Sequence, residues 1–271
     1  MLNKIGGREG EMSSSLGWTV TDFLQRLNVL GIEEEPRPSE FKHHDIKLGK
    51  KTFSIESAGW DVAAGRACAR FAEITGPSMN ISTVMLYPTR SPEILPVFAA
   101  EWVVFGQNIH TLVLDVETCS KADNLLEQMR QSFAPIHERW SQVFPSNRDK
   151  PAWFESIETP WALFGQANVD QMASLRQAFQ DYLDVTLANF YQPGIEQAVA
   201  GEDHPDVTNY KHHHYVNSPG HRLLGVKFGQ KHTDQLLKNW HFGPARPALV
   251  DEGSKSSSMM GHHNQGSSLW T

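Results

Sequence analysis

Cysteine and long apolar runs are scarce in this chain. Its 271 residues include two cysteines, Cys68 and Cys119. Two are too few for a disulfide framework, for an all-cysteine zinc site or for a cysteine-ligated cluster built from this chain alone. Low cysteine use is typical of a reducing compartment. No run approaches the roughly 20 apolar residues of a membrane-spanning helix, and residues 1–15 lack the apolar segment of a signal peptide. We therefore expect no membrane association.

Motifs for common cofactors and an excess of positive charge are also missing. GxGxxG and the phosphate-binding GxxxxGK motif do not occur, so nothing supports a nucleotide cofactor. The GxSxG motif of nucleophilic serines is absent as well. Acidic residues outnumber basic ones by 31 to 24, which gives a formal charge of −7. A nucleic-acid partner therefore has no electrostatic support.

Histidine is abundant but poorly spaced for a metal ion. The 13 histidines include the run of His212, His213 and His214. Adjacent side chains on a helix point about 100° apart, so these three cannot ligate one ion together. HExxH is absent, and no second cluster has ligand spacing. We expect no metal site.

Short runs rich in Val, Ile, Leu, Thr and aromatic residues occupy much of residues 51–117, with Pro and Gly between them. Consecutive strands without intervening helices predict an antiparallel sheet. The predicted strands are residues 51–58, 67–75, 81–87, 102–105 and 111–116, with a further strand in 161–168.

Helical periodicity precedes and follows these strands. Thr21 or Asp22 can cap a first helix that carries Phe23 and Leu27 on one side, and a Pro-broken acidic linker (31–40) ends it. Later helices are predicted at residues 120–132, 135–144, 169–191, 203–215 and 232–240. This order predicts an α+β fold, a three-layer α/β/α sandwich with a central antiparallel sheet flanked by helices. We expect one domain at residues 18–243, a flexible N-terminus (1–17) and a disordered tail (244–271).

Several acids stand in unusual surroundings. Glu101 follows two alanines and precedes Trp102, so it lies either at a strand mouth facing water or in a pocket where its pKa is raised. Glu73 lies within a predicted strand, and Asp203 and Asp206 lie in the segment GEDHPDVTNY. For each acid taken alone, a solvated or helix-capping role is the simpler interpretation. The residues by themselves leave the function open.

Four segments add a family resemblance. In chain order they are VMLYPTRSPEILPVFAAEWV, TLVLDVE, PAWFESIETPWALFGQAN and NYKHHHYVNSPGHRLLGVKFGQKHTDQLLKNWHF. This series resembles the ferredoxin-dependent bilin reductases, which form phycocyanobilin, phycoerythrobilin or phytochromobilin, and it covers about residues 50–243. The resemblance implies a bilin between the sheet and the C-terminal helices. It also implies electrons from reduced [2Fe–2S] ferredoxin, protons from side chains through bilin radicals, and no bound metal, flavin or nicotinamide.

The same resemblance implies catalytic roles for several acids. Glu101 stands where most members have an Asp that contacts the pyrroles, which makes it the expected central proton donor. Glu73 stands where phycocyanobilin-forming members have a proton-donating Glu. The second Asp of the family corresponds to Asp203 or Asp206, and the two alternatives stay open. Thr83 occupies a position that is His in phycocyanobilin-forming members, and because Thr cannot titrate it weakens the case for that product.

Further residues are expected to contact the bilin or ferredoxin. Cations are needed near the bilin propionates, and Lys211, Arg222 and Lys227 are candidates. The densest basic group, Lys47, Lys50 and Lys51, is either a ferredoxin-docking surface or an ordinary solvated face. The implied bilin contacts are Thr83, Phe98, Trp102, Tyr210, Lys211, His214, Asn217 and Arg222.

The resemblance leaves more than one activity open. The first is reduction of biliverdin IXα or 15,16-dihydrobiliverdin to a phytobilin. Red chlorophyll catabolite reductase is a distant relative with Glu at the site of Glu101, so reduction of another linear tetrapyrrole is the alternative. A non-catalytic bilin carrier is the third, although the acid at Glu101 argues against it. We expect a monomer in the cytoplasm or the plastid stroma that receives its substrate from heme oxygenase or a neighbouring bilin enzyme.

Overall fold

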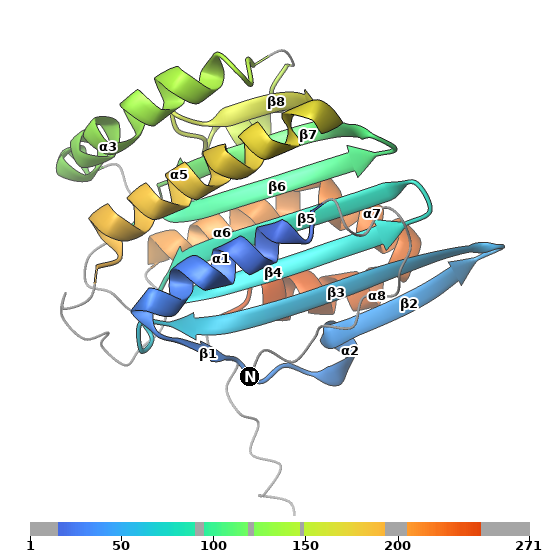
Figure 1. Ribbon diagram of the computed structural model, residues 1–271. Helices are drawn as coiled ribbons and strands as arrows, with labels where there is room; N and C mark the ends of the chain where they lie inside the picture. The colour runs from blue at the N-terminus through green and yellow to red at the C-terminus, as the bar shows by residue number, and fades with distance from the viewer. Residues whose placement is uncertain (1–15, 90–94, 119–121, 147–148, 193–204, 245–271) are drawn as a thin grey trace, which may run out of the picture.

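An antiparallel sheet forms the centre of the computed structural model, which describes residues 16–89, 95–118, 122–146, 149–192 and 205–244 (Figure 1). All of its pairings are antiparallel, as expected, and the strand order is β1-β3-β4-β5-β6-β7-β8, with β2 also paired to β3. The eight strands are β1 (Ile32–Glu34), β2 (His43–Leu48), β3 (Lys51–Val62), β4 (Ala67–Gly76), β5 (Met79–Pro88), β6 (Val97–Phe105), β7 (Asn108–Glu117) and β8 (Leu163–Asn168). Of the predicted ends, 1–17 and 244–271, residues 1–15 and 245–271 lie outside the described residues, as do Cys119 and Asp203.

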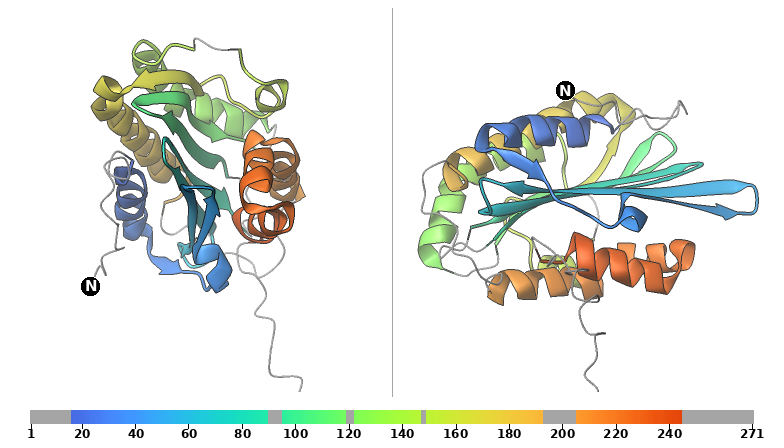
Figure 2. Two further views of the ribbon diagram at one scale, coloured as in Figure 1. Left: turned by 90° about the vertical axis from the view of Figure 1, so that its right-hand side faces the viewer. Right: turned by 90° about the horizontal axis from the view of Figure 1, so that it is seen from below.

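Three helices cover one face of the sheet: α1 (Trp18–Leu27), α3 (Asp123–Ser141) and α5 (Met172–Phe190) (Figure 2). The main apolar core lies between them and the sheet. Phe179 of α5 packs edge-on against both Phe98 and Trp102 of β6, with ring centroids 5.5 and 6.2 Å away. Fully buried aromatic side chains of this size make this face the main source of hydrophobic stabilisation.

The C-terminal helices cover the opposite face: α6 (Pro205–Asn217), α7 (Pro219–Phe228), α8 (Gln230–Leu236) and the π-helical turn η3 (Leu237–His241). A separate core joins Phe53, Ile74 and Ile81 of the sheet to Phe228 and Trp240 of these helices. The short helices α2 (Ser39–Lys42) and α4 (Ala152–Glu155) and the turns η1 (Asn28–Leu30) and η2 (Val169–Gln171) complete the fold. The predicted α+β sandwich is confirmed.

Two expected helix boundaries are wrong. Helix α1 begins at Trp18, so Thr21 and Asp22 lie inside it. Asp22 does not cap the helix because its carboxylate pairs with Arg176 of α5, with Nε–Oδ2 and Nη2–Oδ1 distances of 2.6 and 2.7 Å. Helix α3 is continuous through Pro135, where two helices were expected. Its buried side is continuous across the proline because Phe133 and Ile136 both join the core, so packing against α5 maintains the helix.

Strands β1 and β2 and helix α7 were not predicted from the sequence, nor were the short helices α2 and α4. Strand β1 lies in the acidic linker and pairs with the end of β3. Helix α7 begins with a recognisable signal, because the Ser218 hydroxyl accepts a hydrogen bond from Gly220 N and Pro219 occupies the first turn. Of the two alternatives for Glu101, a strand mouth facing water or a pocket that raises its pKa, the strand mouth is wrong, because Glu101 is in the middle of β6.

Candidate active site

Side chains of β6 alternate between the two faces of the sheet. Glu101 pairs with Thr83 of β5 and Val113 of β7. Because successive residues of a strand point to opposite faces, these three face the C-terminal helices, whereas Phe98 and Trp102 face α1 and α5. The acid and its aromatic sequence neighbours therefore lie in different layers.

The prediction that Phe98 and Trp102 contact a bilin beside Glu101 is wrong. Both are fully buried in the main core. The Phe98 ring stacks on Phe23 with centroids 6.1 Å apart, and Trp102 Nε1 donates a hydrogen bond to Thr19 Oγ1 at 3.2 Å. Their role is to hold α1 and α5 against the sheet.

Glu73 also lies on the wrong face for a proton donor beside Glu101. It pairs with Ser82, which in turn pairs with Trp102, so all three face the α1 and α5 layer. Burial raises the pKa of Glu73, and Asn80 Nδ2 donates to its Oε1 at 2.9 Å. The β4 residue that shares the row of Thr83 and Glu101 is Ala72, so the predicted role of Glu73 is wrong.

The C-terminal helices leave the middle of their sheet face partly uncovered. Thr83, Glu101 and Val113 belong to central strands, yet each keeps accessible surface. Residues on the other face of the same strands, such as Ala100 and Leu114, are at most 1% exposed. A central strand can retain exposure only where the layer above it does not fill the space. We refer to this space, above Ala72, Thr83, Glu101 and Val113, as the sheet groove.

Glu101 is the titratable member of the row formed by Ala72, Thr83 and Glu101. Burial raises the pKa of its carboxyl; the nearby His214 lowers that pKa and the Glu117 carboxylate raises it further. A carboxyl whose pKa is raised by burial holds its proton closer to neutrality, which suits it to act as a general acid. Its accessible surface in the groove leaves the acid within reach of a ligand.

A second acid, Glu117, anchors α6 to the sheet. Glu117 is 1% exposed at the end of β7. One of its oxygens, Oε2, accepts a hydrogen bond from the Tyr210 hydroxyl and lies 3.2 Å from His214 Nε2. Tyr210 and His214 are one turn apart on α6, so both reach the same carboxylate. The structure thus places the predicted residues Tyr210 and His214 in one cluster with an acid that the sequence interpretation missed.

Asp115 is a further acid that the sequence interpretation missed. It is fully buried on the same face as Glu117, two residues before it. Its oxygens accept hydrogen bonds from the Thr159 N and Oγ1 at 2.9 and 2.5 Å, while burial and the Glu117 charge raise its pKa well above the usual range. The signal was present in TLVLDVE, where two acids alternate at the end of an apolar strand. Asp115 holds the loop that contains Thr159 against the sheet.

His214 is enclosed by aromatic rings. Tyr210, Trp153 and Phe242 surround the imidazole with centroid distances of 4.6, 5.6 and 5.7 Å. Its side chain keeps 11% exposure. The ring is therefore fixed in orientation without being sealed from water.

A comparison with known protein families shows the family to which this chain belongs. A family model described as "Ferredoxin-dependent bilin reductase" matches residues 21–243. The chain belongs to this family. It is therefore an oxidoreductase of the bilin-reducing, ferredoxin-dependent class, as the resemblance predicted.

Relatives agree with this membership. The phycoerythrobilin:ferredoxin oxidoreductase of Prochlorococcus marinus is 25% identical over 240 residues, which cover 81% of this chain and 90% of that protein. The enzyme of the same name from Synechococcus sp. is 27% identical over 192 residues, covering 63% and 72%. A crystal structure of tomato phytochromobilin synthase in complex with biliverdin has a TM-score of 0.70 at 15% identity and covers 84% of this chain and 83% of that one. At that identity the match establishes the fold.

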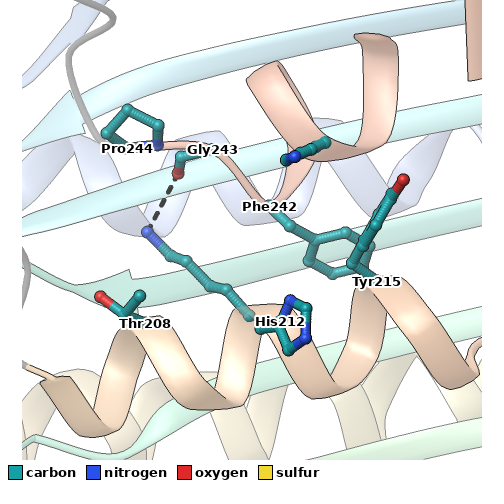
Figure 3. A pocket seen from close by; sticks show the side chains of 8 residues that line it. Thr208, His212, Tyr215, Phe242, Gly243 and Pro244 are labelled. Carbon is teal, nitrogen blue, oxygen red and sulfur yellow. Dashed lines mark hydrogen bonds between the residues drawn. The ribbon is translucent and has the colours of Figure 1, made fainter. Parts of the chain in front are cut away.

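The reductase has a pocket of about 320 Å³ between α6 and the end of η3. Among the lining residues, Lys211 donates from Nζ to the Gly243 carbonyl at 3.1 Å, the dashed line in Figure 3. The Lys211 nitrogen also lies 4.9 Å from the centre of the Tyr87 ring. The pocket is lined by Thr208, Lys211, His212, Tyr215, Lys238, Phe242, Gly243 and Pro244.

The remaining predicted residues that the structure describes lie on α6 and α7. Asp206 is half-buried in the first turn of α6, one turn before Tyr210. Asn217 and Arg222 are exposed, and the Asn217 amide donates to the His213 carbonyl at 2.9 Å. The structure does not bring these two into the cluster of Glu117, Tyr210 and His214, and their bilin contacts stay predictions.

The described part of the reductase has neither a metal-binding cluster nor a membrane-spanning helix. Within it, no three His, Cys, Asp or Glu side chains are grouped so that they could hold a metal ion. No helix among the same residues is long and apolar enough to cross a membrane. The absence of a bound metal or flavin stays a prediction.

Proposed function

We propose that this protein reduces biliverdin IXα or 15,16-dihydrobiliverdin to a phytobilin, with electrons from reduced [2Fe–2S] ferredoxin. The observation that carries the proposal is Glu101, an acid with a raised pKa in a partly exposed groove at the centre of the sheet. A reductase of an open-chain tetrapyrrole needs such a group because protonation makes the π-system easier to reduce.

The bilin lies in the sheet groove, between β4–β7 and the C-terminal helices. Small or apolar side chains at Ala72 and Val113 leave room for a flat ligand, and Phe242, which keeps accessible surface, offers an aromatic ring at its edge. Lys211, Arg222 and Lys227 supply positive charge for the propionates. Lys227 Nζ lies 4.6 Å from the centre of the Phe53 ring, and Arg222 is exposed.

Glu101 donates the proton and ferredoxin supplies the electrons one at a time. In the first step the Glu101 carboxyl transfers its proton to the bilin and becomes a carboxylate, and one electron from ferredoxin converts the protonated bilin to a radical. In the second step a further proton and a further electron from ferredoxin quench that radical. A two-electron reduction consumes two protons. Asp206, or Asp203, is the second donor near an end ring.

Ferredoxin docks at the tip of the β2–β3 hairpin. Lys47, Lys50 and Lys51 are exposed there, and a group of positive charges steers an acidic partner to one surface even when the net charge of the enzyme is negative. The formal charge of −7 therefore comes from acidic residues outside this hairpin tip.

An anaerobic absorbance time course with biliverdin IXα, ferredoxin and a ferredoxin-reducing system tests the function. We expect a bound-bilin spectrum that passes through a transient radical band to a new product, and chromatography then identifies the reduced double bond. A bound spectrum that reduced ferredoxin leaves unchanged would contradict biliverdin reduction. The same run with 15,16-dihydrobiliverdin then decides between the two bilins.

Reduction of a chlorophyll catabolite is the second candidate, because Glu rather than Asp stands at position 101, as in red chlorophyll catabolite reductase. Product formation from red chlorophyll catabolite, together with no turnover of either bilin, would favour it.

A further inference from the structure

The last helices of the fold are basic, although the chain as a whole is acidic. The segment from α7 to η3, residues 219–241, contains four lysine and arginine residues and one acid, Asp234. The whole chain has 31 acidic and 24 basic residues. These helices therefore carry a net positive charge on a protein of the opposite sign, which is the kind of asymmetry that directs a charged partner to one surface.

The one acid of this segment is engaged in helix packing. Asp234 Oδ1 accepts hydrogen bonds from Gln230 Nε2 at 2.7 Å and from the Tyr215 hydroxyl at 3.2 Å, and it lies 2.7 Å from His221 Nε2. These three side chains belong to α8, α6 and α7. The carboxylate thus ties the three helices together and leaves the positive charge on their outer side unopposed by an acid of the same segment.

Exposed lysines occupy the side of α8 and η3 that faces away from the sheet. Lys231, Gln235 and Lys238 recur at intervals of four and three residues and are all exposed, whereas Leu236 and Trp240 pack on the sheet. This outer side is available to a partner.

An apolar side chain lies beside this positive charge. Val226 is 73% exposed on α7, on the side opposite the buried Leu224 and Phe228. A protein interface combines apolar contacts at its centre with charged groups at its rim. Val226 together with Lys231 and Lys238 provides both kinds of contact.

The β2–β3 hairpin is adjacent to the same surface. Lys227 Nζ of α7 lies 4.6 Å from the centre of the Phe53 ring of β3. Phe53 joins the core beneath the C-terminal helices, and Lys51 lies two residues before it on the same side of the strand. The views of Figure 2 show the C-terminal helices packed under the face of the sheet to which this hairpin belongs. The positive charges of the hairpin tip and of α7–α8 are therefore neighbours.

The hairpin tip by itself is small for a docking surface. A specific protein interface uses about 20–30 residues on each side, and electron-transfer complexes are at the lower end of the size range. Three lysines around one turn supply only part of that area. The C-terminal helices supply more of it, and they lie on the side of the sheet that Glu101 faces.

We propose that ferredoxin docks on the outer side of α7, α8 and η3 as well as on the hairpin tip. We call this surface the basic face and define it by Lys50, Lys51, Val226, Lys231 and Lys238. The inference rests on the proposed function, which takes its electrons from reduced [2Fe–2S] ferredoxin. Carboxylates of the acidic partner pair with the lysines, and Val226 is covered by the interface.

Titration of the bilin-free enzyme with oxidised ferredoxin, followed by calorimetry, tests the basic face without turnover. Lys231→Glu combined with Lys238→Glu should weaken the Kd by at least about tenfold at low salt and reduce its dependence on ionic strength. The matched control is Arg130→Glu combined with Arg139→Glu, on α3 across the sheet, where the side chains are 61% and 60% exposed. This control changes the net charge equally and should alter the Kd by less than about twofold.

A second pair of variants tests the apolar contact. Val226→Ser should weaken ferredoxin binding by at least about threefold, because the interface would cover this side chain. Val29→Ser is the matched control, since Val29 is 76% exposed on η1, after the helix of the opposite layer, and it should leave the Kd unchanged. Thermal unfolding checks that every variant folds as the wild type does.

Three results would overturn the basic face. The first is equal weakening by the α3 control and by the Lys231 and Lys238 pair, which would show that net charge alone acts. The second is an unchanged Kd in the Lys231 and Lys238 pair while charge reversal at the hairpin tip weakens binding, which would confine ferredoxin to the tip. The third is the absence of ferredoxin binding to the wild type at low salt.

Binding and turnover together separate this surface from the proposed function. If ferredoxin binds through the basic face but reduced ferredoxin converts neither bilin, the proposed function fails and the docking surface stands. If bilin is reduced while the Lys231 and Lys238 pair keeps the wild-type Kd and KM for ferredoxin, the function stands and the docking surface is wrong.

Discussion

Glu101 and Trp102 are adjacent in the sequence, yet their side chains lie on opposite faces of the sheet. Glu101 shares its face with Thr83 and the C-terminal helices, whereas Trp102 donates a hydrogen bond to Thr19 of α1. Glu101 borders the sheet groove and is placed for catalysis, whereas Trp102 belongs to the main core and contributes to stability. Substitutions on the two faces should therefore have different effects.

Replacing the acid should affect turnover more than binding. Glu101→Gln keeps the size of the side chain but cannot donate a carboxyl proton, so we expect biliverdin to bind while turnover falls by at least about tenfold. Glu73→Gln, on the opposite face, is the matched control and should change turnover by less than about twofold. Anaerobic single-turnover spectra measure both, and full activity of Glu101→Gln would remove Glu101 from the mechanism.

The raised pKa of Glu101 should also make stability depend on pH. Because burial raises this pKa in the folded protein, the folded state holds the proton more tightly than the unfolded state does. The carboxyl therefore costs no stability at low pH, and stability is lost as pH rises from the unfolded value through the folded one. Urea unfolding across this range should show a smaller loss in Glu101→Gln, which cannot ionise. An identical pH dependence in the two proteins would show that the pKa is not raised.

Truncating the other face should reduce stability without removing the site. Phe98→Ala deletes a fully buried ring that stacks on Phe23, so we expect the free energy of unfolding to fall by about 3–5 kcal/mol. Denaturant unfolding monitored by tryptophan fluorescence measures the loss. The folded fraction should bind biliverdin with a Kd within about threefold of the wild type; a much weaker Kd would mean that Phe98 does contact the ligand.

Arg70 of β4 forms a buried ion pair and also hydrogen-bonds to the C-terminal helices. Arg70 Nη2 and Glu35 Oε2 are 2.9 Å apart with both side chains at most 3% exposed, and Arg70 Nε donates to the Trp240 carbonyl at 3.2 Å. Gly59 permits this packing, because a Cβ there would lie 2.5 Å from Arg70 Nη1.

Removing Arg70 leaves Glu35 buried and unpaired, so Arg70→Met should lower the free energy of unfolding by about 3–5 kcal/mol. The matched control is Arg130→Met, which breaks the exposed pair with Glu127 and should cost less than about 1 kcal/mol. Thermal and denaturant unfolding compare the two. Equal losses would contradict the importance of the buried pair.

The basic tip of the β2–β3 hairpin should affect the association with ferredoxin but not the binding of biliverdin. Reversing the charge at Lys47, Lys50 and Lys51 together should raise the KM for ferredoxin about tenfold at low salt and flatten its dependence on ionic strength. Biliverdin Kd is the internal control and should not change, because the three side chains are exposed at the tip of β2–β3. Unchanged salt dependence would place ferredoxin on another surface.

Sequence patterns predicted the strands of residues 51–117 well because their apolar and β-branched runs are bounded by Pro and Gly. They predicted less where tertiary contacts override local preference, as in α3, which continues through Pro135 because Phe133 and Ile136 both join the core. They also missed β2, a polar strand that pairs with β3 at the edge of the sheet.

For the site, the sequence and the family resemblance singled out Glu101, Tyr210, His214 and Lys211, but not Glu117. Tyr210 and His214 are near it only because α6 folds back onto β7, 93 and 97 residues away along the chain. A contact of such separation leaves no local trace in the sequence. An acid at the end of an apolar strand was the available hint.

The sequence by itself determined the class of protein. The order of strands and helices, and the four short segments that carry the family resemblance, can be recognised without knowing the structure. Only the tertiary structure decided which acids share a space. Strand register assigns Glu73 and Glu101 to opposite faces, since a shift of one residue moves a side chain to the other side of the sheet. The packing of α6 against the sheet then brings His214 to Glu117, and no local sequence pattern predicts that contact.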